Sequence, residues 1–154
     1  MGTVVDALYK IKYNPFKFGE YIASFYSEIK NVDNNLLLAP IIIPLCSHPV
    51  FKTKLEGAVF GPKKQSSLWS IFDDRTKLYD LQERVDEFKI LTNQSIHYCL
   101  VNDWLAINVE TLTLSYLVDK EVPMQIQKNA ENLGKLLSGL SITEIYAFLG
   151  VKPR

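Results

Sequence analysis

The spacing of apolar residues changes in the last third of the chain, and this change constrains the fold more than any other feature. From Thr92 to about Trp104 apolar side chains recur with a helical period. From Leu105 to Tyr116 they alternate with polar ones, and a polar stretch at Asn108–Glu110 divides the alternating run. A helical period predicts a helix, with Thr92 as its N-cap, and two short alternating runs predict a β-hairpin.

Two more helices are predicted after the hairpin. Pro123 suits the first position of a helix, and Gly139 suits its left-handed end. Ser141 and Glu144 form a capping-box pattern ahead of a last short helix. The stripe of the longer helix contains Ile126, Ala130, Leu133 and Leu137. The order helix, hairpin, helix, helix predicts a winged-helix-like unit over residues 92–154.

The N-terminal part of the chain predicts helices only. Asn14-Pro15 opens the first clear helix, and further helical spacing recurs at about residues 50–55, 66–72 and 78–88. The apolar run Leu36–Cys46 is 11 residues long and contains Pro40 and Pro44, which should kink or split it. A membrane span needs about 20 residues, so we interpret the run as core and expect no membrane association.

The predicted fold class is therefore mainly α with one small antiparallel β-hairpin. We expect a single winged-helix-like domain over residues 1–154, in which the N-terminal helices (1–91) pack on the unit 92–154. Two cysteines are too few for a disulfide scaffold, and residues 1–12 hold no continuous apolar segment of the kind found in secretion signals. Both observations favour a cytoplasmic protein.

The distribution of charge bears on nucleic-acid binding. The chain has 17 basic and 17 acidic side chains, with a net charge of +3 over residues 1–77 and −3 over residues 78–154. Gripping a duplex depends on a basic surface. The predicted reading helix has Asn93, Gln94 and Asn102, yet residues 93–103 contain no lysine or arginine. A winged-helix DNA-binding transcriptional regulator therefore stays as the alternative function, and the acidic half argues against it.

Four blocks of sequence, in order, carry a family resemblance. They are Tyr13-Asn14-Pro15 with its helix; Leu36–Leu55, an apolar run that leads into a His-Pro pair; Arg84–Ile107, with an Asp-Trp-Leu exit; and Ala130–Pro153, with a Leu-Gly pair and a closing Leu-Gly-Val-Lys-Pro. In these blocks the chain resembles the middle components of bacterial three-component ABC systems, the group that includes the small accessory subunit of Lamassu-type antiphage defence.

This resemblance implies a non-enzymatic accessory subunit that links an SMC- or Rad50-like coiled-coil ATPase to a co-encoded effector, often a nuclease. DNA would then meet the subunit only through the complex, and no cofactor is implied. Apolar side chains outside the main helical stripes are the candidate partner-binding residues, because a few buried anchors dominate most interfaces. They are Tyr26, Trp69, Tyr79, Tyr98 and Phe148. The candidate contacts to a phosphate backbone are Lys52, Lys54, Lys63 and Lys64.

Catalytic and metal-binding patterns are weak. Cys46 with His48, and His97 with Cys99, could together supply two-cysteine, two-histidine zinc ligands. Each pair is separated by one residue, whereas zinc ligand pairs are usually spaced more widely, and residues i and i+2 of a helix do not face one another. Both cysteines lie in apolar segments, which is unfavourable for a reactive thiolate. We therefore expect no metal and no enzymatic activity.

Overall fold

The computed structural model describes residues 3–117 and 124–152. It is mainly helical with one two-stranded antiparallel sheet, which confirms the predicted fold class. The elements in order are α1 (Val4–Lys12), α2 (Pro15–Glu28), the 3₁₀ helix η1 (Asn35–Leu38), α3 (Ala39–Cys46), α4 (Pro49–Glu56), α5 (Leu68–Ile71), the 3₁₀ helix η2 (Arg75–Leu78), α6 (Leu81–Glu87), α7 (Lys89–Val101), β1 (Leu105–Asn108), β2 (Thr113–Tyr116), α8 (Lys128–Leu137) and α9 (Ile142–Leu149).

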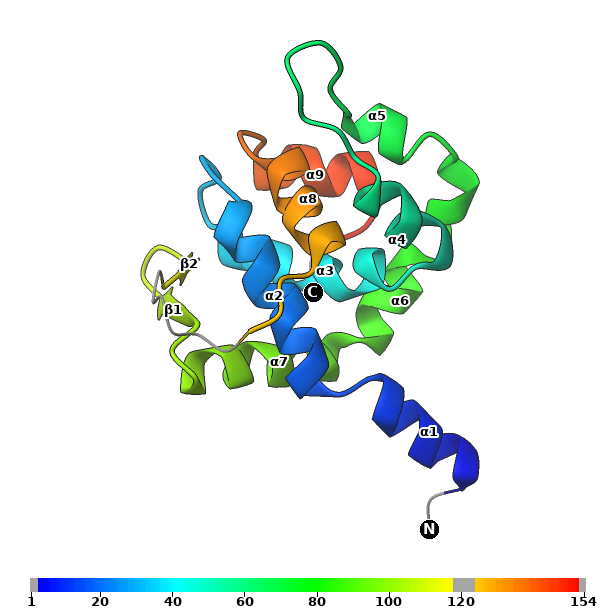
Figure 1. The fold of residues 1–154 in the computed structure, drawn as a ribbon, viewed down its shortest axis with the longest axis vertical. Coiled ribbons are helices and arrows are strands. Elements are labelled where there is room, and N and C mark those ends of the chain that lie inside the picture. The colour runs from blue at the N-terminus through cyan, green and yellow to red at the C-terminus, as the bar shows by residue number, and fades with distance from the viewer. Residues whose placement is uncertain (1–2, 118–123, 153–154) are drawn as a thin grey trace.

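The central helix of the body is α2, which packs against both α7 and α8 (Figure 1). Asn14 caps it and Pro15 occupies its first turn, as predicted. Two glycines allow the close approach of the neighbouring helices. A Cβ at Gly19 would lie 2.8 Å from the Tyr98 ring, and a Cβ at Gly134 would lie 2.5 Å from the backbone oxygen of Phe25. The contacts of α2 with α7 and α8 thus depend on residues without a side chain.

The apolar run lies inside the protein. Its first part forms η1 and its second part forms α3, with Pro40 near the start of α3 and Pro44 inside it. From Ile41 to Cys46 every residue is buried. Two side-chain amides of α8 bond to backbone carbonyls at the ends of α3 and α4: Asn129 donates to Cys46 O (3.0 Å) and Asn132 donates to Leu55 O (2.8 Å).

Within residues 3–117 and 124–152, none of the helices taken singly has both the length and the apolar composition to cross a membrane. One pair of consecutive helical segments, Asn35–Cys46 and Pro49–Glu56, has that length and apolar composition when taken together. The two segments are bent by 104° relative to each other.

The hairpin has the predicted strands. Leu105 pairs with Tyr116 and Asn108 pairs with Thr113. The outer edge of β2 is closed by the side chain of Asn35, whose oxygen accepts from Leu114 N (2.8 Å) and whose amide donates to Leu114 O (3.2 Å). The hairpin is therefore fastened to η1, far away in the sequence.

Two local predictions are wrong. Thr92 does not cap a helix: α7 begins at Lys89, and Thr92 is buried within it. The helix predicted from Pro123 begins at Lys128, because the segment before it runs along α2, where Gln127 N donates to Ser24 Oγ (2.9 Å). Pro123 itself lies outside the described residues. The boundary predicted after residue 91 falls inside α7. The two-part organisation and the winged-helix likeness stay predictions.

Helix α1 was not predicted. Thr3 and Asp6 form a capping box at its start, and this pattern could have indicated the helix. No residue of α1 is buried, and Figure 1 shows the helix pointing away from the body.

Candidate partner-binding surfaces

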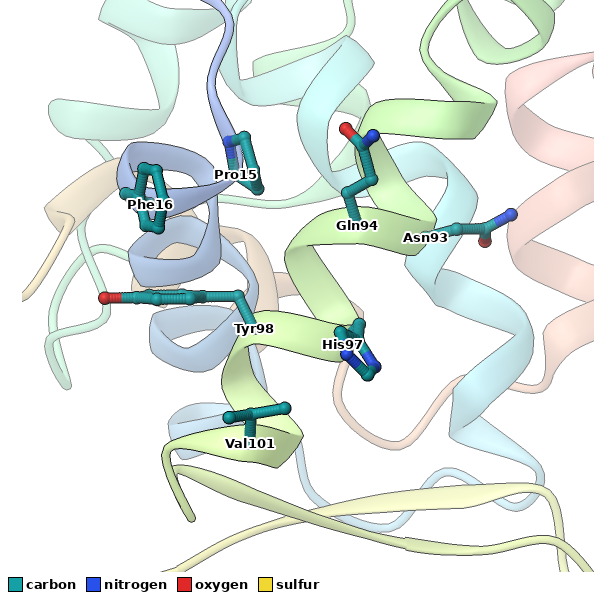
Figure 2. A pocket seen from close by; sticks show the side chains of 7 residues that line it. All are labelled: Pro15, Phe16, Asn93, Gln94, His97, Tyr98 and Val101. Atoms are coloured by element: carbon teal, nitrogen blue, oxygen red, sulfur yellow. The ribbon is translucent and has the colours of Figure 1, made fainter.

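A groove of about 550 Å³ lies between the start of α2 and the outer face of α7 (Figure 2). Its walls, which we call the α2–α7 groove, carry no lysine, arginine, aspartate or glutamate. Phe16 and Val101, on opposite walls, are each 65% exposed. Large apolar side chains that remain this accessible around a hollow are typical of a binding surface. The lining residues are Pro15, Phe16, Asn93, Gln94, His97, Tyr98 and Val101.

Tyr98 forms the floor of this groove. Its ring packs edge-on against Phe16 at a centroid distance of 5.1 Å and against Trp104 at 5.3 Å. Figure 2 shows the ring directed from α7 toward Phe16. Trp104 is buried, so the Tyr98 ring is held from below by the core and is partly open above. A rigid aromatic ring of this kind binds with a small loss of conformational entropy.

Trp69 and Phe148 meet in a second surface, which the structure builds from α5, η2 and α9. Their rings pack edge-on with centroids 4.9 Å apart, and Trp69 is 68% exposed. The Arg75 guanidinium lies 4.5 Å from the Phe148 ring centroid and 5.8 Å from that of Trp69. Arg75 also donates to the backbone oxygen of Phe148. We call these three residues the Trp69 patch.

Tyr79 is 83% exposed and lies apart from both surfaces, beside His48 and Arg84. His48 Nδ1 accepts from Val50 N (3.1 Å) and caps α4, which requires a neutral imidazole. Burial lowers the pKa of His48, and the nearby positive charge of Arg84 lowers it further. The His48-Pro49 pair, which belongs to the second block of the family resemblance, therefore forms the start of α4.

Tyr26 is a correction to the list of surface candidates. Its side chain is only 3% exposed, and its hydroxyl donates to Asn35 O (2.7 Å) inside the protein. Tyr26 lies one position after Phe25 on α2, a helix that is enclosed on several sides. Its side chain is therefore buried even though it lies outside the main apolar stripe of the helix.

The four candidate lysines do not form one cluster. Lys54 forms an ion pair with Asp73, and this hydrogen bond lowers the pKa of the Asp73 carboxyl. Lys52 is exposed on α4, whereas Lys63 and Lys64 lie in the turn of the long loop between α4 and α5, where Gly61 N donates to Lys64 O (3.1 Å).

The potential zinc ligands are dispersed as well. Within the described ranges, no three His, Cys, Asp or Glu side chains are grouped to hold a metal ion. Cys99 donates to Gly19 O (3.1 Å) in the contact between α7 and α2, while His97 faces the groove. Burial raises the pKa of the Cys99 thiol to about 12 and that of Cys46 still higher, so neither is a thiolate at neutral pH.

Sequence reasoning did not find Phe16, Val101 or Ile90, although Ile90 is 72% exposed on the same face of α7 as the groove. One signal was available. From Ile90 to Val101, a stretch of three helical turns, the chain contains no lysine, arginine, aspartate or glutamate. A surface helix usually has a charged outer face, so an uncharged one indicates contact with another molecule.

The structure is that of a small, mainly helical protein with two separate exposed aromatic surfaces. The family described as ABC-three component (ABC-3C) system Middle Component 3 matches residues 3–153. The chain belongs to this family and is a middle component of an ABC-3C system, which confirms the resemblance and fits the role of an accessory subunit. No curated protein and no solved structure matches the chain.

Proposed function

We propose that the chain is a non-enzymatic adaptor in a cytoplasmic antiphage defence complex of the Lamassu type. In this proposal it binds an SMC- or Rad50-like coiled-coil ATPase and a co-encoded effector such as a nuclease, and it meets DNA only through the complex. The observation that carries the proposal is the presence of two aromatic surfaces in different parts of the molecule, the α2–α7 groove and the Trp69 patch. An adaptor needs two such surfaces.

The energetics of binding favour the exposed aromatic residues as anchors. Trp, Tyr and Arg dominate the binding energy of most interfaces when they are buried by a partner. The Trp69 patch offers an exposed indole whose edge-on contact with Phe148 and nearby Arg75 hold it in place before binding. Tyr98 is supported in the same way by Trp104. Preordered anchors lose less entropy when a complex forms.

Support for a non-enzymatic role comes from the state of the nucleophiles. Both thiols are buried and have raised pKa values, and His48 is engaged as a helix cap. The exposed carboxylates Asp73 and Asp74 bond to Lys54 and Thr76 respectively, as solvent-facing carboxylates commonly do. A partner-binding role needs none of these groups to react.

The first experiment is purification of the tagged full-length chain from its native host at moderate salt, with identification of the co-eluting proteins by mass spectrometry. We expect a large coiled-coil ATPase in near-stoichiometric yield, together with the effector. Recovery of the chain alone would contradict the adaptor proposal. Salt-sensitive binding of a DNA duplex by that isolated chain would then support the alternative, a DNA-binding regulator.

A pair of variants shows whether the Trp69 patch takes part. Trp69→Asp should abolish or strongly reduce recovery of one component, since a buried charge without a partner is costly at an interface. Val109→Asp is the matched control, because Val109 is 69% exposed at the tip of the hairpin and belongs to neither surface. Equal recovery with both variants would remove the Trp69 patch from the proposal while leaving the adaptor role intact.

A further inference from the structure

A pocket of about 470 Å³ lies where the start of α4 meets η2 and α6, and it shares no lining residue with either aromatic surface. We call it the His48 pocket. Three residues with nitrogen donors line it, namely His48, Lys77 and Arg84. Asp80 is the only acidic residue among the described residues that line it. With a neutral imidazole the pocket therefore has a net positive charge.

His48 presents one fixed hydrogen-bond donor. Its Nδ1 accepts from Val50 N (3.1 Å), so the proton of the neutral ring is on Nε2. His48 is only 7% exposed, and its ring packs on Phe51 with centroids 4.4 Å apart, so its orientation is set before any ligand binds. Because Nδ1 faces the backbone of α4, Nε2 is the edge of the ring left for the pocket. Within residues 3–117 and 124–152, no acceptor bonds to it.

Arg84 brings a positive charge that the chain itself neutralises incompletely. Its Nη2 donates to Pro44 O (3.2 Å) and Ser47 Oγ (3.0 Å), which are neutral acceptors. Its Nε is buried without an acceptor, and the guanidinium forms no ion pair with a carboxylate in the described part of the chain. A partly buried charge without a counter-ion is unfavourable. An anion bound beside Arg84 would stabilise it.

The charges around the pocket favour a single carboxylate over a row of phosphates. Asp80 lines the pocket, and Asp74 and Glu83 are exposed within two residues of the lining, so the successive charges of a nucleic-acid strand would be repelled. A lone carboxylate needs only the positive centre, where its two oxygens suit the guanidinium of Arg84 and a neutral imidazole donor. Tyr79, which is 83% exposed beside this centre, is a residue typical of protein interfaces.

We infer that the His48 pocket binds the carboxylate of an aspartate or glutamate from a partner protein. Arg84 and Lys77 supply the positive charge, and the Nε2–H of His48 supplies a directed hydrogen bond. The inference adds a charged contact to the two aromatic surfaces. It rests on the adaptor proposal for the partner protein, whereas carboxylate binding itself is measurable on the isolated chain.

A titration of the full-length chain with N-acetylglutamate amide tests the site, with the histidine ring nitrogens followed by NMR. The chain has two histidines, so His97 in the α2–α7 groove is an internal reference. We expect a saturable shift of His48 Nε2, with a Kd on the order of 1–10 mM, and no such shift of His97. N-acetylglutamine amide has the same shape without the charge and should not saturate the site. Equal shifts with both probes, or no saturation at His48, would overturn the inference, as would tighter binding of inorganic phosphate.

Two variants assign the binding to the pocket. Lys77→Gln should weaken the binding of N-acetylglutamate amide about threefold, as for the loss of an exposed charge pair. Lys64→Gln removes the same charge in the loop between α4 and α5 and should leave the Kd unchanged. Arg84→Lys keeps the charge and loses the forked donor, so we expect about tenfold weaker binding. Unchanged binding in both pocket variants, with wild-type circular dichroism, would place the carboxylate elsewhere and overturn the inference.

Carbodiimide coupling in the complex purified from the native host identifies the partner. The reagent joins a lysine amine to a carboxylate in contact with it, so Lys77 should be linked to an aspartate or glutamate of a co-purifying component, and Lys64 should not. Lys77→Glu should reduce recovery of that component, while Lys64→Glu should not. Equal recovery with both variants would overturn the inference and leave the adaptor role intact. If the wild-type chain is recovered alone, the adaptor proposal fails, and the titration still decides whether the pocket binds a carboxylate.

Discussion

Helices α1 and α2 follow one another with two residues between them, and they differ in almost every source of stability. In α2, eight of 14 residues are buried, and the helix contacts α7 and α8 along its length. In α1, none of nine residues is buried, and its support comes from a capping box and the contacts of its last turn. Both sequences contain apolar residues at helical spacing, so spacing alone does not distinguish a core helix from an exposed one.

The difference lies in what the neighbouring segments provide. The surroundings of α2 include Gly19 and Gly134, which let two other helices approach it closely, and the segment before α8, whose Gln127 N donates to Ser24 Oγ (2.9 Å). Nothing comparable adjoins α1 among the described residues. Tertiary packing therefore stabilises α2, whereas α1 depends on its capping box and on the contacts of its last turn.

The contact between α2 and α8 should be the most sensitive to substitution. In Gly134→Ala the new Cβ would lie 2.5 Å from the backbone oxygen of Phe25, so the two helices must separate. We expect a loss of about 3 kcal/mol or more in the free energy of unfolding, as for severe overpacking. Chemical denaturation measures it. Gly57→Ala is the control, because its Cβ would make only ordinary contacts at 3.6 Å, and an equal loss there would contradict the explanation.

The next effect concerns the buried amides of α8. Asn132 is 2% exposed and donates to Leu55 O (2.8 Å), so Asn132→Ala would remove a buried hydrogen bond, although Leu55 O still accepts from Ala58 N (3.2 Å). We expect a loss of about 1.5 kcal/mol in the free energy of unfolding, as for the loss of one hydrogen bond. Asn102→Ala is the matched control, since Asn102 makes a similar bond to Tyr98 O (2.8 Å) at an exposed position. Similar losses in both variants would contradict a role for burial.

Much of the fold was predictable from local patterns. Asn14-Pro15, Ser141 and the alternating run after Trp104 each act within a few residues, and each marked the correct element. Thr92 and Pro123 misled because long-range contacts override local preference: Thr92 is enclosed within α7, and the segment at Gln127 bonds to Ser24 of α2. A residue of a capping type forms a helix cap only where the helix begins and its first backbone N–H groups lack other partners.

The candidate surface was less predictable. The pairing of Trp69 with Phe148 joins residues 79 positions apart, and no local pattern indicates it. Tyr26 was misplaced because α2 is covered by several elements, so its side chains lie inside even when they depart from the main stripe. The α2–α7 groove depends on which face of α7 stays uncovered, and that is decided by the packing of α2 on the opposite side.

A smaller and pH-dependent effect is expected at His48. The folded protein needs the neutral imidazole as the cap of α4, and burial lowers the pKa of His48 below its ordinary value of 6.5. The stabilising contribution is complete above pH 6.5 and is lost as the pH falls through the lowered pKa. It should amount to about 1 kcal/mol, a typical value for a helix cap.

Unfolding curves at several pH values below and above 6.5 measure this contribution. Asp80 opposes the shift and Lys77 adds to it, so both are kept unchanged. The variant His48→Asn retains an acceptor for the cap without titrating, and it should remove this part of the pH dependence. His97→Asn, at an exposed site in the groove, should leave the pH dependence of the unfolding free energy unchanged. If this variant removed that pH dependence and His48→Asn did not, the explanation through the α4 cap would be wrong.

The smallest effect on global stability, and the sharpest test of the comparison, is at the start of α1. Thr3→Ala removes the acceptor for Asp6 N (3.1 Å), yet no buried contact depends on it, so the free energy of unfolding should change by less than about 0.5 kcal/mol. Hydrogen exchange should show the contrast directly: amides of α2 exchange only on global unfolding, while those of α1 exchange by local opening. Protection of α1 equal to that of α2 would mean that the helix is already stabilised by packing within the chain, and the distinction between the two helices would fail.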